Sequence, residues 1–298
     1  MNIRNHFPFW ILVLVLILQR IAVLVLFNSE YTDNDQTLAW LMAQDYSQGI
    51  FHQPFIYGQD YNYMIEALLA VPLLWCKVPV ESALPIISNL LAILPFVSFA
   101  FWYKRQDNLT AAVIFLAIPL FLPISYALIT SIPRGFINGL ALFAFWPWIG
   151  NILRIGMRNV LYGMILVAAF VINPNVIFTA VFLGGMVFLR AEMKMRTVMF
   201  ILVGGTIPVL IHLISLNWVY YHADQLMHFS WGLEWTWDYF KNAFGENSAA
   251  YFRGVVPFSE KFSLIIFLIF PALTFMYSFL NQHISSFFDK SRTFFLLL

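Results

Sequence analysis

Long apolar runs separated by polar connections cover most of the chain, and they predict membrane-spanning helices. A helix needs about 20 predominantly apolar residues to cross a bilayer. Eight runs reach or approach this length: 8–27, 83–103, 110–130, 136–153, 160–172, 176–189, 198–218 and 262–280. The first is interpreted as a retained helix rather than a signal peptide, since no small-residue cleavage site follows it. We therefore expect an all-α polytopic membrane protein.

A further apolar run, 64–78, is predicted to be interfacial or re-entrant rather than spanning. It is short, and it contains Glu66, Pro72 and Lys77. If the N-terminus is cytoplasmic and this run does not cross, most of the 16 Lys and Arg residues fall on the cytoplasmic side, and most of the 15 Asp and Glu residues fall outside. The predicted topology has eight spans and two large outer loops, 28–82 and 219–261, with short interfacial helices.

The composition narrows the class of protein further. Hydrophobic residues make up 61% of the chain and charged residues 10%, whereas soluble domains have about 25% charged residues. These values exclude a soluble globular domain and a disordered chain. The net charge of +1 gives no basis for a nucleic-acid partner. The single cysteine, Cys76, excludes a disulfide framework and a cysteine-based metal site.

The predicted spans contain few ionisable groups, with Arg20 and His212 as the main exceptions. Transporters usually place their functional polar groups near the bilayer midplane, so we expect the chemistry of this chain at the outer membrane surface. Arg20 is predicted either to extend outward to the interface or to pair with a neighbouring side chain. Asn173-Pro174-Asn175 is interpreted as a tight turn between two spans, with binding of sugar hydroxyls as the alternative.

The first outer loop begins with two acidic residues, Asp33 and Asp35, ahead of a helix predicted over 37–46. The apolar stripe of that helix, at i, i+3, i+4 spacing, is formed by Leu38, Leu41 and Met42. One carboxylate at the helix N-terminus is explained by capping, because it accepts hydrogen bonds from free backbone amides. Capping does not require a second carboxylate, so it leaves one of the two aspartates unexplained.

Several short motifs of this loop point to a known family. They are Asp35, Met42-Ala43, Gly49, Tyr57-Gly58-Gln59, Tyr61 and Glu66-Ala67. In order and spacing this segment resembles the first outer loop of the GT-C glycosyltransferases, and within them the bacterial branch of protein O-mannosyltransferases and the lipid A aminoarabinose transferase. The chain departs from the family at Gln36, where an Asp-Glu pair is usual, and it is shorter than most members. It is interpreted as a single GT-C-like module over 1–298, or as the N-terminal part of a longer chain.

The resemblance implies an enzyme that moves a sugar from a polyprenyl-phosphate-linked donor to an acceptor hydroxyl or amine. The acceptor is a lipid, glycan or protein, and the site lies on the non-cytoplasmic face of a bacterial inner membrane. Asp35 is the expected general base, with Asp33 as the alternative. The leaving phosphate is a stable anion and needs no general acid. It needs positive charge or backbone amides; Arg134 is the candidate cation, with Lys77, Arg253 and Lys261 as rivals.

The remaining candidate residues fall in both outer loops and in one outer turn. The residues assigned to substrate binding are Tyr57, Gln59, Tyr61, Glu66, Arg134, His228 and Asp238. For Arg134 the alternative role is lipid anchoring, and for Glu66 it is capping or pairing within its own helix. No cofactor is predicted, although histidines of the second loop could bind a divalent metal with a first-loop carboxylate. The alternative functions are a lipid or solute transporter and a catalytically inactive GT-C-like subunit.

Overall fold

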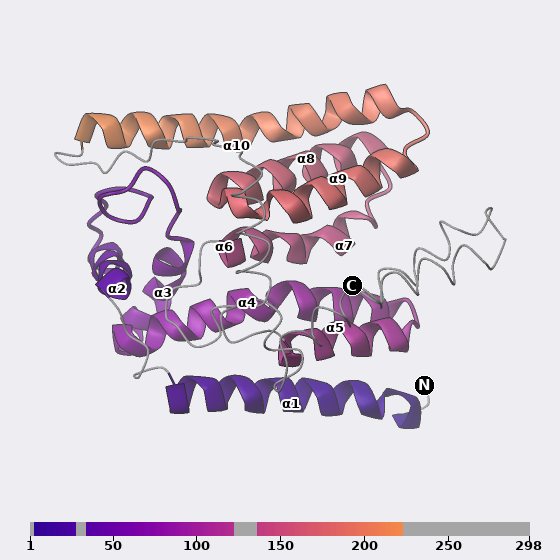
Figure 1. Ribbon diagram of the computed structural model, residues 1–298, viewed down its shortest axis with the longest axis horizontal. Coiled ribbons are helices and arrows are strands. Elements are labelled where there is room, and N and C mark those ends of the chain that lie inside the picture. Colours follow the sequence, from indigo (N-terminus) through magenta and orange to yellow (C-terminus); the bar gives the residue numbers. More distant parts are fainter. Residues whose placement is uncertain (1–2, 28–33, 122–135, 223–298) are drawn as a thin grey trace, which may run out of the picture. The chain divides into compact units, whose positions relative to one another are not determined.

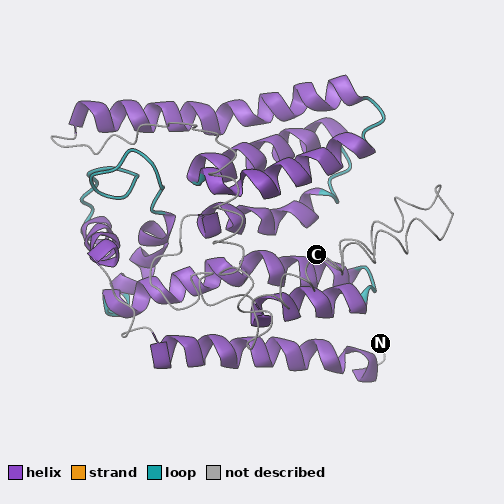
Figure 2. Ribbon diagram, viewed as in Figure 1, coloured by secondary structure: helices purple, strands orange, loops and turns teal. Residues whose placement is uncertain are grey.

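The computed structural model describes residues 3–27, 34–121 and 136–222, and this part of the chain is helical (Figures 1 and 2). Its helices are α1 (Ile3–Phe27), α2 (Asn34–Ser47), α3 (Ile65–Trp75), α4 (Val80–Arg105), α5 (Leu109–Phe121), α6 (Phe136–Ala141), η1 (Leu142–Phe145), α7 (Trp146–Ile149), α8 (Ile155–Ile172), η2 (Pro174–Val176), α9 (Ile177–Arg190) and α10 (Lys194–His222). An isolated antiparallel bridge joins Phe55 and Tyr63 between α2 and α3. The predicted all-α class is confirmed for the described residues.

Within the described residues, four helices are long and apolar enough to cross a membrane: residues Phe7–Leu26 of α1, together with α4, α8 and α10. Helix α1 contains the predicted span 8–27, and α4, α8 and α10 contain the predicted spans 83–103, 160–172 and 198–218. The chain is a membrane-embedded α-helical protein. The described part of run 110–130, residues 110–121, lies in the shorter apolar helix α5, and run 176–189 corresponds to the shorter apolar helix α9; residues 122–130 lie outside the described residues. Run 262–280 lies outside the described residues, so the count of eight spans stays a prediction.

The predicted span 136–153 is not one regular helix but the succession α6, η1 and α7. Pro147 explains the interruption, because a proline inside a helix has no N–H to donate and its ring clashes with the carbonyl of residue i−4. The chain tightens to a 3₁₀ turn just before it. Ser98 of α4 supports this stretch, since its hydroxyl donates to the carbonyl of Ala144 and accepts from the indole Nε1 of Trp148 at 2.7 Å.

The run 64–78 forms only the 11-residue helix α3. At a rise of 1.5 Å per residue such a helix is about 16 Å long, roughly half of the bilayer core. It ends at Trp75, and Lys77 follows with a left-handed φ of 67° and an N–H that donates to the carbonyl of Leu74 at 2.9 Å. This length fits the predicted interfacial or re-entrant segment.

Helices α2, α3 and the start of α4 share a core of small and medium apolar side chains. Its buried members are Ala39, Met42, Ala43, Ile56, Met64, Ala67, Ala70, Val80, Ala83 and Leu84. The helix predicted over 37–46 is confirmed, but its buried stripe differs, because Leu41 is exposed and Ala39 and Ala43 are buried instead. The alanines lack bulk, so α2 and α3 can approach closely across them.

The chain divides into two compact units. Of the described residues, 3–19 and 103–121 belong to the first, and 20–27, 34–102 and 136–222 belong to the second. In the described part of the first, the Lys104 ammonium lies 4.6 Å from the ring centroid of Phe9 and 4.1 Å from that of Trp10. These contacts tie the last turn of α4 to the beginning of α1.

In the second unit, α8, α9 and α10 pack side by side (Figure 1), and the closest approach is between α8 and α10. A Cβ atom at Gly163 would lie 2.7 Å from the carbonyl carbon of Ile201, and one at Gly204 would lie 2.7 Å from that of Val160. Only glycine fits at such backbone contacts. Asn159 and Thr197 add a buried hydrogen bond of 3.3 Å across the same pair of helices.

Candidate functional site

The segment that resembles the family loop is fixed to the ends of distant helices of the second unit. Asn173, at the end of α8, donates from Nδ2 to the Oδ1 of Asn62 at 2.8 Å. Near the end of α10, the Tyr220 hydroxyl donates to the Oδ2 of Asp60 at 3.1 Å, and the Trp218 indole donates to the carbonyl of His52 at 3.3 Å. The loop between α2 and α3 therefore has a defined position on these helix ends.

Aromatic side chains of the loop also pack against His212, near the middle of α10. The Tyr63 hydroxyl lies 3.1 Å from the Nδ1 of His212, and Phe55 is completely buried against both rings. His212, one of the ionisable residues predicted within the spans, thus contacts the first outer loop. The other, Arg20, is buried and donates to the Oδ1 of Asn89 at 3.2 Å, so it pairs with a neighbouring side chain.

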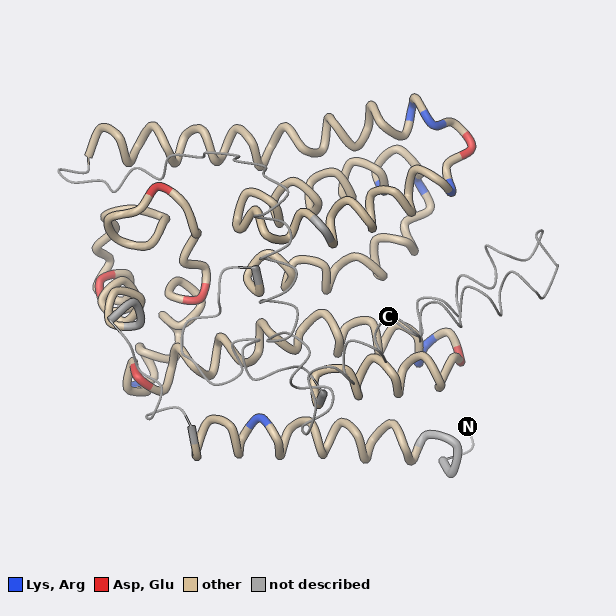
Figure 3. The backbone as a smooth tube through the Cα atoms, viewed as in Figure 1, with Lys and Arg blue, Asp and Glu red and all other residues tan. Residues whose placement is uncertain are grey.

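Basic residues gather at one end of α8, α9 and α10, where Glu192 is the acidic exception, and acidic residues of the loop between α2 and α3 lie at the other end (Figure 3). The basic residues at the connections α7–α8 and α9–α10 are Arg154, Arg158, Arg190, Lys194 and Arg196. The other ends of α8 and α10 contact the loop between α2 and α3, which contains Asp60. By the positive-inside rule, the loop end is the expected outer end.

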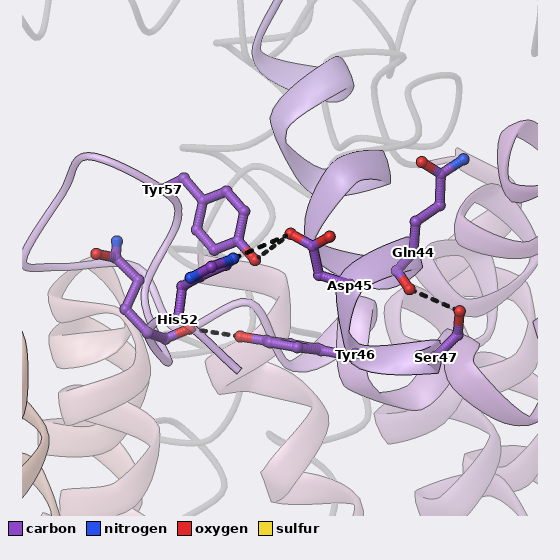
Figure 4. A network of polar contacts seen from close by, with 7 residues as sticks. Gln44, Asp45, Tyr46, Ser47, His52 and Tyr57 are labelled. Atoms are coloured by element: carbon purple, nitrogen blue, oxygen red, sulfur yellow. Dashed lines mark hydrogen bonds and ion pairs between the residues drawn. The ribbon is translucent and has the colours of Figure 1, made fainter. Parts of the chain in front are cut away.

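Figure 4 shows a polar cluster around Asp45, in the last turn of α2. Its Oδ2 accepts a hydrogen bond from the Tyr57 hydroxyl at 2.8 Å, and the Nε2 of His52 lies 3.8 Å from the same oxygen. The Tyr46 hydroxyl donates to the carbonyl of Gln53 at 2.6 Å. Burial and the hydrogen bond to Asp45 raise the pKa of Tyr57, which therefore remains a protonated donor at neutral pH.

The Tyr57-Gly58-Gln59 motif forms a turn whose backbone carbonyls accept hydrogen bonds from the buried side chain of Gln53. The Nε2 of Gln53 donates to the carbonyl of Ile56 at 2.6 Å and to that of Gln59 at 3.2 Å. Gly58 has a φ of 82°, a conformation that residues with a Cβ rarely adopt. The turn holds Tyr57 where its hydroxyl meets Asp45 and leaves the Oε1 of Gln59 without a hydrogen-bond partner among the described residues.

Glu66 opens α3 and is completely buried. Its Oε2 accepts from the Nδ2 of Asn138, in α6, at 2.5 Å, so its partner lies outside its own helix. Burial raises the pKa of Glu66 to about 7, against the lowering effect of its hydrogen bonds.

Among the predicted site residues, the structure brings Tyr57, Gln59, Tyr61 and Glu66 together on one loop and the helix that follows it. Asp35 lies in the first turn of α2. Asp33, Arg134, His228 and Asp238 lie outside the described residues. Asn173 forms the predicted turn, since its Oδ1 accepts from the backbone N–H of Asn175 at 2.9 Å.

Sequence reasoning did not select Asp45, His52, Gln53 or Asn138. Asp45 and Gln53 are ordinary polar residues of an outer loop, and only their contacts with Tyr57 and its turn distinguish them. For Asn138 the available signal was an amide side chain in a run otherwise interpreted as a span. Within the described ranges, no group of three or more His, Cys, Asp or Glu side chains is arranged to hold a metal ion.

Replacing Tyr57 with Phe is expected to lower the free energy of unfolding by about 1 kcal/mol, because Asp45 loses a hydrogen bond in a partly buried position. Thermal unfolding in detergent measures the change. Tyr221→Phe is the matched control, since Tyr221 is 79% exposed at the end of α10. Equal losses in the two variants would contradict a stabilising role for the Tyr57–Asp45 contact.

Comparison of the chain with protein-family models, with curated proteins and with solved structures finds no match in any of the three. A function for this chain therefore has to be inferred from its residues and their arrangement.

Proposed function

We propose that the chain is an integral membrane glycosyltransferase of the GT-C type. It moves a sugar from a polyprenyl-phosphate-linked donor to an acceptor hydroxyl or amine on the non-cytoplasmic face of a bacterial inner membrane. The observation that carries the proposal is the fixed attachment of the loop that resembles the family, through Asn62, Asp60 and His52, to the ends of α8 and α10.

A fixed loop suits this chemistry, because catalysis by proximity requires reacting groups to be held close together in a productive orientation. Asp35 stands in the first turn of α2, and the Tyr57 turn is bonded to the last turn of the same helix. Both lie on elements whose small apolar residues pack into one core. A lipid-linked donor presents its phosphate at the membrane surface, which is also where a re-entrant α3 would lie.

The proposed reaction is a single inverting displacement. The acceptor O–H or N–H gives its proton to the carboxylate of Asp35, and the acceptor atom forms a bond to the anomeric carbon of the sugar. The bond between that carbon and the phosphate oxygen breaks, and the polyprenyl phosphate leaves with the electron pair. Arg134 is the proposed cation for the phosphate, and Asp33 is the alternative base.

Transfer assays with purified protein test this proposal. The protein in detergent is incubated with radiolabelled polyprenyl-phosphate sugars and a membrane extract as the acceptor source, and in parallel with the corresponding nucleotide sugars. We expect transfer from a lipid-linked donor and none from the nucleotide donors. If folded protein neither transfers nor binds any of the lipid-linked sugars, the proposal fails and a transporter or inactive subunit is favoured.

A further inference from the structure

The junction between α3 and α6 contains two buried oxygen atoms that lack hydrogen-bond partners. Glu66 is completely buried and Asn138 is 4% exposed. One hydrogen bond joins them, from the Nδ2 of Asn138 to the Oε2 of Glu66. The Oε1 of Glu66 and the Oδ1 of Asn138 have no hydrogen-bond partner among the residues that the structure describes. Unsatisfied buried polar atoms are rare and destabilising, so this pair needs a physical explanation.

A single proton shared between these two oxygens would satisfy both. A carboxyl group and a carboxamide are planar groups of similar size, and each can present one donor beside one acceptor. An ionised Glu66 has acceptors only, and its Oε1 would leave the Asn138 carbonyl without a donor. A protonated Glu66 has an O–H that can donate to the Oδ1 of Asn138 while its other oxygen accepts from Nδ2.

We propose that Glu66 is held as the neutral acid in a pair of reciprocal hydrogen bonds with Asn138, and that this pair is a proton-dependent latch between α3 and α6. The latch joins the start of α3, which follows the loop after α2, to α6, the first element of the interrupted apolar stretch α6, η1 and α7. It requires no assumption about the reaction that the chain catalyses.

The surroundings of the pair favour the neutral form. The apolar core against α3 comes from α2, from the loop at Ile56 and Met64, and from the start of α4. The ionisable residues on the elements packed against α3 are Asp35, Asp45 and Tyr46 on α2, His52, Tyr57, Asp60, Tyr61 and Tyr63 on the loop, and Glu81, Tyr103, Lys104 and Arg105 on α4, and α6 has none. Asp45 is bonded to Tyr57, and Glu81 is exposed. Burial, not a neighbouring charge, is the largest cause that raises the pKa of Glu66.

The direction of the pH effect follows from linkage. The pKa of Glu66 is about 7 in the folded protein, above the value of 4.5 for a free side chain. The folded state therefore binds more protons than the unfolded state between these values, and stability falls as the pH rises through this window. The contribution of the latch is fully present below the lower pKa and is lost as the pH rises through about 7.

Infrared difference spectroscopy detects the protonated carboxyl group directly. The spectrum of the Glu66→Gln variant is subtracted from that of the full chain in detergent. Glutamine can preserve the latch, because its Nε2 can donate to the Oδ1 of Asn138. We expect a carboxylic-acid C=O band that belongs to Glu66 and disappears with a midpoint near pH 7. Absence of this band at about pH 5, where the latch should be closed, would overturn the proposal.

Thermal unfolding across the same pH range tests whether protonation of Glu66 stabilises the folded protein. The melting temperature of the unchanged protein should fall relative to that of Glu66→Gln as the pH rises. The matched control is Glu81→Gln, which makes the same chemical change at an exposed carboxyl. Its melting temperature should follow that of the unchanged protein. A difference between the unchanged protein and Glu66→Gln that does not vary with pH would show that Glu66 is no proton-dependent latch.

Discussion

Replacing Asp35 with Asn should lower the rate of sugar transfer by about 10²–10⁴-fold while donor binding is retained. Asparagine has nearly the same size as aspartate, but it cannot take the proton of the acceptor in the transition state. The position of the residue in the first turn of α2 is compatible with asparagine, which is also a good helix N-terminal residue. Initial rates of transfer and equilibrium binding of the lipid-linked donor measure the two effects separately.

Asp107→Asn is the matched control for this substitution. Asp107 lies in the turn between α4 and α5, and its φ of 55° is a left-handed conformation that asparagine also tolerates. This variant should transfer at the rate of the unchanged protein. If Asp35→Asn also transfers at the rate of the unchanged protein, Asp35 is not the base. The next variants to measure are then Asp33→Asn and substitutions of carboxylates in the second outer loop.

Gly163→Ala and Gly204→Ala should each lower the free energy of unfolding by about 3 kcal/mol, at the upper end of the usual overpacking cost. Each new Cβ would lie 2.7 Å from a backbone carbonyl carbon of the facing helix, so α8 and α10 would have to separate. A backbone atom cannot rotate away as a flexible side chain can. The apparent melting temperature in detergent measures the loss.

Gly185→Ala, on the neighbouring helix α9, is the control for these two variants. A Cβ at Gly185 meets no heavy atom within 4 Å. Alanine is a better helix former than glycine, by about 1 kcal/mol in water, so this variant should be neutral or more stable. If Gly204→Ala were as stable as Gly185→Ala, the close crossing of α8 and α10 would be wrong.

The long helices were predictable because the bilayer imposes a requirement along the chain itself. The hydrocarbon core requires a helix, which satisfies its own backbone polar groups, and side chains that are mostly apolar, so a span appears as a long, predominantly apolar run. The runs that became α1, α4, α8 and α10 meet this condition. The run 136–153 is equally apolar, yet the irregular stretch before Pro147 receives its support from Ser98, 46 residues from Ala144 in sequence.

The candidate site was predictable only where a motif was local. The Asn173 turn depends on backbone geometry within a few residues, and it occurs as predicted. The partners of the motif residues come from elsewhere in the chain. Asn138 is 72 residues from Glu66, and Asn173 is 111 residues from Asn62. No local pattern encodes such pairs, because helix packing alone brings them together.

By itself the sequence determined that this is a membrane-embedded helical protein and that its first polar loop contains a short helix followed by another too short to span. Both conclusions follow from hydropathy and helical periodicity, which are properties of consecutive residues. Only the tertiary structure decided that the loop is fixed to the ends of α8 and α10 and that Glu66 is buried against Asn138. Burial and hydrogen-bond partners depend on which surfaces meet in space, and they set the proton affinity of Glu66.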